Sequence, residues 1–112
     1  MPHWLTSHRV IRSMHTATNA ARQRYGLQPL VLDLPMSLAA QRWAVEMSRT
    51  GYSHSPWQWS ECIHCGPRSA DECVRDWMWS GQHRSILLSG QRAGFGYWRT
   101  QQGNTFWVAE VA

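Results

Sequence analysis

Apolar residues recur with the period of an α-helix in three stretches of the chain. The first runs from about Thr6 or Ser7 to Tyr25, and a glycine at position 26 is a natural helix end. The second is expected to begin at Ser37 and end near Arg49, and the third begins at a capping box over residues 69–72. The predicted inward-facing residues are Ile11, Met14, Thr18, Ala21 and Tyr25 in the first helix, Ala40, Trp43, Ala44 and Met47 in the second, and Ala70, Cys73, Val74 and Trp77 in the third.

Two strands are predicted near the C-terminus, at Gly94–Arg99 and Thr105–Val111. A short loop containing a glycine separates them, which is typical of an antiparallel hairpin. Both faces of the last strand are apolar, so helices are expected to cover both sides of the sheet. Residues 28–32 and 61–66 are further short extended segments. Together these elements predict an α+β fold, a three-layer α-β-α sandwich with a small antiparallel sheet.

Length and composition indicate a single domain over residues 1–112, with residues 1–8 as a loose lead-in. No apolar run is long enough for a membrane span, and no signal peptide is visible. The net charge is +4, and all eleven basic residues are arginines. Because these arginines are scattered along the chain, we expect no nucleic-acid partner.

A Ser-Gly break at residues 80–81 follows the third helix, and a short second helix is expected after it. This break places His83 on a first helical turn, where its side chain can face a cleft. The packed helix that ends at Trp79 would therefore hold His83 in a fixed position.

Several motifs resemble the CAP superfamily, the SCP-like domains related to cysteine-rich secretory, antigen 5 and pathogenesis-related proteins, in its bacterial branch. The matching segments are Asn19-x-x-Arg22-x-x-x-Gly26-Leu27-x-Pro29-Leu30, Ser53-His54-Ser55, Ser60-Glu61-Cys62-Ile63, Trp77-Met78-x-Ser80-x-x-His83-Arg84-x-Ile86-Leu87 and Gly94-Phe95-Gly96. They span about residues 15–111 in the family's order. Two departures are a cysteine at position 62, where the family has asparagine, and a short connection between His54 and Glu61.

The resemblance implies that His54, Glu61 and His83 meet in one cleft. Two imidazoles and a carboxylate suit a first-row divalent metal such as Zn²⁺, weakly bound for lack of a second carboxylate. Alternatively, Glu61 would not bind the metal itself but would orient a histidine or a water that does. An inert cleft, in which the three side chains only bond one another, is a third interpretation. If Glu61 acted as a general base, the domain would be a metal-dependent hydrolase. No residue can be named catalytic from the sequence, however, and we expect the protein not to be an enzyme.

Cys62, Cys65 and Cys73 form a secondary candidate site, because the first two make a C-x-x-C pair. Free thiols, one disulfide from Cys73 to either of the others, and a metal site all remain open. Cys73 lies on the apolar stripe of its helix, which is typical of a small core residue. Trp57 and Trp59 flank the cavity loop and are expected to cover a small core, although an aromatic wall for a sugar or lipid is the alternative.

Three functions follow as hypotheses. The first is a non-catalytic binding or adaptor module, with a protein partner or assembly, a lipid or a glycan as its ligand. The second is the metal-dependent hydrolase, and the third is an accessory component of a larger assembly such as a phage particle. The family resemblance suggests an extracellular location, and a virion or release by lysis would fit the missing signal peptide. Ligand, partner and oligomeric state do not follow from the sequence.

Overall fold

The computed structural model describes residues 3–4 and 8–112. Most of the predicted lead-in, and the predicted helix start at Thr6 or Ser7, lie outside this part. The elements follow in the order α2 (Arg9–Arg24), β1 (Val31–Leu32), α3 (Leu34–Thr50), β2 (Ser60–Cys65), α4 (Ala70–Trp79), α5 (Gly81–Leu87), β3 (Arg92–Arg99) and β4 (Thr105–Val111). No helix among the described residues is both long and apolar enough to cross a membrane.

The strands form one mixed sheet in the order β1-β3-β4-β2. The predicted hairpin is confirmed, since β3 and β4 pair antiparallel with Gly94 opposite Glu110 and Arg99 opposite Thr105. Strand β2 pairs antiparallel with β4 and forms one edge. Strand β1 pairs parallel with β3, a pairing that the sequence did not predict. The predicted α-β-α sandwich is therefore confirmed, with one parallel pair added to its antiparallel sheet.

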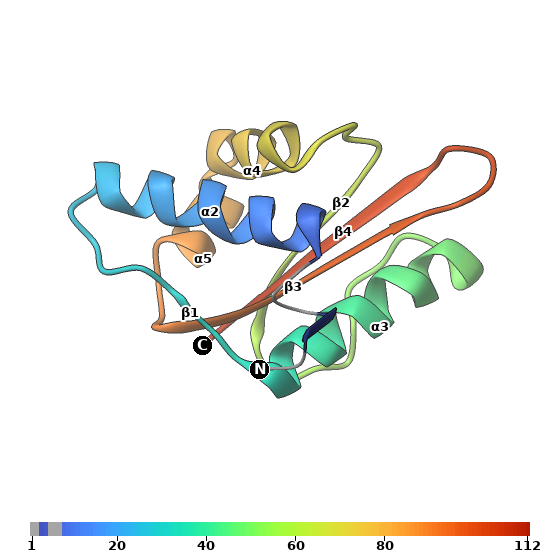
Figure 1. Cartoon of the computed structure of the whole chain (residues 1–112), viewed down its shortest axis with the longest axis horizontal. Helices are drawn as coiled ribbons and strands as arrows, with labels where there is room; N and C mark the ends of the chain where they lie inside the picture. Colours follow the sequence, from blue (N-terminus) through green and yellow to red (C-terminus); the bar gives the residue numbers. More distant parts are fainter. Residues whose placement is uncertain (1–2, 5–7) are drawn as a thin grey trace.

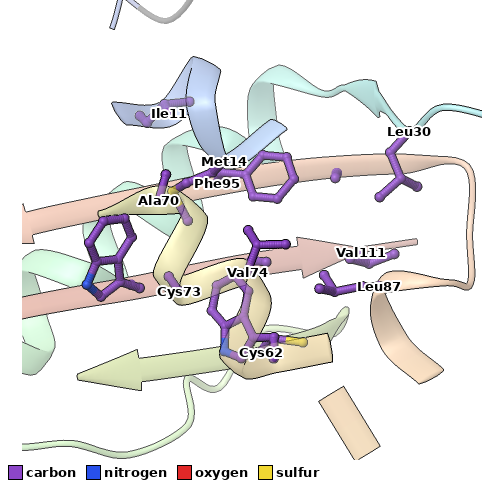
Figure 2. Packing of buried hydrophobic residues seen from close by; sticks show 14 residues of the cluster. Ile11, Met14, Leu30, Cys62, Ala70, Cys73, Val74, Leu87, Phe95 and Val111 are labelled. Atoms are coloured by element: carbon purple, nitrogen blue, oxygen red, sulfur yellow. The ribbon is translucent and has the colours of Figure 1, made fainter. Parts of the chain in front are cut away.

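Helices cover both faces of the sheet, with α2, α4 and α5 on one side and α3 on the other (Figure 1). The larger core lies between the sheet and the first group of helices, and Figure 2 shows Met14, Val74 and Phe95 meeting there. The predicted stripe of α4 is confirmed, because Ala70, Cys73, Val74 and Trp77 are all buried in it. A smaller core joins α3 to the opposite face through Ala40, Ala44, Met47, Ile63, Phe106 and Val108.

Two glycines of β3 allow α3 to lie directly on the sheet. A Cβ atom at Gly94 would fall less than 3.0 Å from backbone atoms of Met36 and Ser37, and one at Gly96 would meet the backbone of Ala40 equally closely. Neither clash can be relieved by turning a side chain, because the atoms met belong to a helix backbone. The Gly94-Phe95-Gly96 motif therefore sets the spacing between helix and sheet.

The Asn19 and Arg22 motif has a structural role. The side-chain amide of Asn19 accepts a hydrogen bond from the Leu30 amide at 2.8 Å and donates one to its carbonyl at 3.3 Å, which fixes the chain leading into β1. Arg22 is buried and donates to four carbonyls: Gln28 (2.7 Å), Leu87 (3.0 Å), Ser89 (2.7 Å) and Gly90 (3.1 Å). These bonds tie α2 to the end of α5, and burial lowers the pKa of Arg22.

Two sequence-based details were wrong. Helix α3 begins at Leu34 rather than Ser37, because Asp33 caps it by accepting a hydrogen bond from the Met36 amide at 3.0 Å, and a proline occupies its first turn. Tyr25 is exposed rather than inward-facing, because α2 ends one residue before it. The predicted start of α4 is confirmed, with Ser69 accepting from the Glu72 amide at 3.1 Å.

Candidate functional site

Glu61 lies on the edge strand β2, close to its first residue. Successive strand residues face opposite sides, and Cys62 and Ile63 belong to the larger and smaller core respectively, so Glu61 shares the α3 side with Ile63. Its carboxylate is nearly buried but accepts three hydrogen bonds from the loop before the strand. His54 Nδ1 lies 2.8 Å and the Ser55 amide 2.9 Å from Oε1, and the Ser55 hydroxyl donates to Oε2. Both oxygens are therefore occupied by the chain itself.

These contacts keep Glu61 ionised. Burial alone raises the pKa of Glu61, but its interactions with Glu110, Ser55 and His54 outweigh burial, and the pKa lies below its ordinary value. A carboxylate with a low pKa and three intramolecular donors is a weak proton acceptor. The geometry therefore favours an orienting role for Glu61 over that of a general base.

Glu110 on β4 stands directly opposite Glu61 in the sheet register. It is fully buried, and within the described residues no N–H or hydroxyl group donates a hydrogen bond to either carboxylate oxygen. Burial raises the pKa of Glu110 to about 10, and the neighbouring Glu61 carboxylate adds to the shift. The interior beside the candidate site thus holds a neutral carboxylic acid next to a carboxylate. Glu110 was not predicted from the sequence, although a glutamate inside an otherwise apolar strand was a signal.

His54 lies in the loop between α3 and β2, and its side chain is 62% exposed. With Glu61 ionised, His54 Nδ1 must be the donor of their hydrogen bond, so Nε2 is the unprotonated nitrogen of the neutral ring. Glu61 therefore selects the tautomer in which Nε2 can bind a metal ion or accept a proton from a ligand.

His83 lies on the first turn of α5, as predicted. Its backbone carbonyl is 3.6 Å from the Cys62 thiol, which anchors the turn to β2. Its imidazole makes no hydrogen bond within the described residues. Burial lowers the pKa of His83, and the nearby imidazoles of His54 and His64 lower it further. His83 is therefore neutral and available to a ligand at neutral pH.

The structure joins His54 and Glu61 directly, but His83 bonds neither of them. His83 instead lines a cleft of about 410 Å³ beside the edge of β2, with Tyr52 and Trp79 among the other lining residues. Among the described residues, no group of three or more histidine, cysteine or acidic side chains is arranged to hold a metal ion. Metal binding by His54, Glu61 and His83 thus stays a prediction.

A second pair, His64 with Asp76, lines this cleft and was not predicted from the sequence. His64 Nδ1 accepts a hydrogen bond from the Cys65 amide at 2.9 Å, so its Nε2 carries the proton and donates to Asp76 Oδ2 at 2.8 Å. Strand β2 supplies the histidine and α4 the aspartate. The distance of twelve residues between them hid the pair, since only the packing of α4 on β2 brings them together.

The three cysteines are free thiols. Cys62 and Cys73 are buried in the larger core, and burial raises the pKa of both thiols. Cys65 is exposed at the end of β2. Because Cys62 and Cys65 are three residues apart in a strand, their side chains face opposite sides of the sheet. A metal site formed by these cysteines remains untested.

Trp57 and Trp59, in the loop before β2, do not line the cleft beside His83. Trp57 packs edge-on against Trp43 with ring centroids 6.4 Å apart, and Trp43 donates to the Ser53 carbonyl at 2.8 Å. Trp59 is half-buried. Trp77 is 1% exposed and donates to the Ile63 carbonyl at 3.1 Å, so the prediction that it belongs to the core is confirmed.

Comparisons with known proteins agree with this architecture. Among solved structures, the chain is similar to an outer surface protein of Borrelia burgdorferi, with a TM-score of 0.81, 14% identity, and 90% of each chain covered. It is also similar to a cysteine-rich secretory protein of Staphylococcus aureus (TM-score 0.69, 16% identity, 93% of this chain and 39% of that one). An extracellular SCP-domain protein of Bacillus anthracis gives a TM-score of 0.68 at 15% identity, with 94% of this chain and 41% of that one covered.

These identities establish similarity of fold alone, and the chain spans well under half the length of the last two proteins. A search of curated proteins found no match. The model of the cysteine-rich secretory protein family, however, matches residues 15–111, nearly the whole chain. The chain therefore belongs to the CAP, or cysteine-rich secretory protein, family.

Proposed function

We propose that this CAP domain is a non-catalytic binding module, and that His54 and His83 hold a divalent cation, Zn²⁺ first, with Glu61 behind His54. The observation that carries the proposal is the hydrogen bond from His54 Nδ1 to Glu61, at 2.8 Å. A carboxylate on one imidazole nitrogen is the usual support of a metal-binding histidine, because it fixes the ring and its tautomer.

The electrostatics support the same assignment. A ligand histidine must be neutral, and the pKa of His83 is lowered by burial and by its neighbouring imidazoles. Because two protein ligands leave the remaining positions of the ion to water, binding should be weak. The relatives named as outer surface and extracellular proteins support a secreted or surface location.

The alternative is a metal-dependent hydrolase that uses the same cleft. The low pKa of His83 favours it, because a neutral imidazole accepts protons. The occupied oxygens of Glu61 oppose it. In a hydrolase with Glu61 as base, Glu61→Gln would abolish turnover and leave Zn²⁺ affinity almost unchanged, whereas an orienting Glu61 affects the affinity itself.

Isothermal titration with Zn²⁺ tests the proposal at about pH 7.5 and about pH 5.5, on either side of the ordinary histidine pKa of about 6.5. Protons compete with the metal for imidazole, so affinity should fall at the lower pH. His54→Ala and His83→Ala should each remove most of the binding, and Glu61→Gln should weaken it by about 10-fold to 100-fold.

His8→Asn is the matched control. It removes an imidazole at the start of α2 but keeps an acceptor for the Ile11 amide, which His8 Nδ1 meets at 3.3 Å. Its affinity should equal that of the unmodified chain. Binding that persists in both His54→Ala and His83→Ala would place the ion outside the candidate site of His54 and His83. Absence of binding at both pH values would refute the metal assignment.

A further inference from the structure

The cleft beside His83 combines aromatic surfaces with polar groups that the protein leaves unused. Trp79 at the end of α4 is 82% exposed, and Tyr52 across the cleft is 53% exposed. Ile63 on the edge strand β2 also lines the cleft, and its carbonyl accepts hydrogen bonds from the Tyr52 hydroxyl at 3.1 Å and the Trp77 indole at 3.1 Å. Tyr52 is therefore held in place, so it can serve as a fixed wall.

Exposed aromatic rings of this size are costly in water, because a tryptophan side chain carries a large apolar area. The two rings flank one hollow, whose volume of about 410 Å³ lies in the range of small-ligand sites. The free faces of Trp79 and Tyr52 therefore suit a flat or weakly apolar surface on a small ligand.

The polar groups of the cleft specify the ligand further. Within the described residues, the Trp79 indole N–H, the Ser80 hydroxyl and the His83 imidazole make no intramolecular hydrogen bond, and Ser80 does not cap α5 with its side chain. Asp76 uses Oδ2 for His64, at 2.8 Å, which leaves Oδ1 to accept from a ligand. The cleft thus offers both donors and acceptors beside its aromatic walls.

We propose that this cleft is a subsite for a neutral pyranose ring of a glycan. The C–H face of a pyranose stacks on an aromatic ring, while its hydroxyls both donate and accept hydrogen bonds. Asp76 would accept from a sugar hydroxyl, and Ser80 and the Trp79 indole would donate. A sugar acid is disfavoured, because Asp76 lines the cleft and no arginine does. The subsite rests on the proposed function only through His83, which both sites share.

The His64–Asp76 pair orients this subsite. The hydrogen bond from His64 holds the Asp76 carboxylate against the wall of the cleft, and His64 is itself fixed through the Cys65 amide at 2.9 Å. The imidazole is already satisfied at both nitrogens, so its function is to position Asp76. His64→Gln should therefore weaken sugar binding less than Asp76→Asn.

NMR titration with maltotriose and with tri-N-acetylchitotriose, two neutral oligosaccharides, tests the proposal. One of them should shift the Trp79 indole signal and the backbone amides of Ser80 and His83, with a dissociation constant on the order of 1 mM. Trp79→Ala should weaken this binding at least about tenfold, as for other stacking contacts. The substitution should leave folding intact because the side chain is so exposed.

Trp98→Ala is the matched control, since Trp98 is also an exposed tryptophan, 43% exposed, but lies on β3 and does not line the cleft. It should leave the sugar-induced shifts unchanged. Zn²⁺ affinity in Trp79→Ala should stay at the level of the unmodified chain, so failure of the sugar site and failure of the metal site give different results. The proposal would be overturned if neither sugar shifted these signals. It would also be overturned if the Trp79 signals changed with protein concentration instead.

Discussion

Replacing Glu110 by glutamine should stabilise the protein at neutral pH. The folded chain keeps this carboxyl neutral, since burial raises its pKa to about 10, while the unfolded chain ionises it at about pH 4.5. Ionisation therefore stabilises only the unfolded state between these two values. At pH 7 the difference of about 2.5 pH units corresponds to at most about 3 kcal/mol, at 1.36 kcal/mol per unit.

Glutamine has the shape of the neutral acid and cannot ionise in the unfolded chain. Its amide oxygen must still be buried where no N–H or hydroxyl group of the described residues meets the oxygens of Glu110, which offsets part of the gain. We therefore expect Glu110→Gln to raise the free energy of unfolding by about 1–3 kcal/mol at pH 7.

Denaturant melts between about pH 4 and pH 9 provide the assay. The pKa of Glu110 is raised, so its contribution to stability is largest below about pH 4.5 and is lost as the pH rises. Glu110→Gln should remove this decline. Glu61 acts in the opposite sense, because its pKa is lowered and its contribution is lost only as the pH falls below the ordinary range of a carboxyl. A variant that keeps the decline would show that Glu110 is ionised in the fold.

Three further substitutions test the packing. Trp77→Ala should cost about 3–5 kcal/mol in denaturant melts, the range for deleting a buried large aromatic, and a loss below about 1 kcal/mol would exclude Trp77 from the core. Gly96→Ala should cost at least about 3 kcal/mol, because the added methyl meets the α3 backbone and not a side chain that can move; unchanged stability would contradict the close approach of α3. Arg22→Lys should cost about 2–3 kcal/mol, since one ammonium cannot reach four carbonyls, whereas the same change at Arg24 should be neutral.

The sequence predicted the fold well where local signals and packing agree. In α4 the capping serine and the apolar stripe specify the same helix and the same buried face, and both are observed. For α3 the two signals were in conflict. A serine three residues inside the helix resembled a cap, but the helix begins earlier, after Asp33. Proline in the first turn is favourable there, because its missing N–H has no partner at that position in any helix.

The site was predictable only as far as its residues lie near one another in the chain. His54 and Glu61 are linked by a short loop, and the structure joins them. The pair of His64 with Asp76 depends on how α4 packs against β2, and the position of Glu110 opposite Glu61 depends on strand register. Neither the packing of α4 on β2 nor the register of β2 and β4 can be predicted from a local sequence pattern, so these residues were identified only from the structure.

The cost of Glu110 and the position of His54 are connected through Glu61. A hydrophobic residue at position 110 would be buried at a lower cost in free energy, because all of β4 is buried. A neutral acid beside Glu61 adds a proton donor next to a carboxylate that already accepts from His54 and Ser55, and it keeps that carboxylate ionised. An ionised Glu61 in turn keeps the proton of His54 on Nδ1 and leaves Nε2 open. Glu110, which destabilises the fold, thus acts through Glu61 to orient the exposed imidazole of His54.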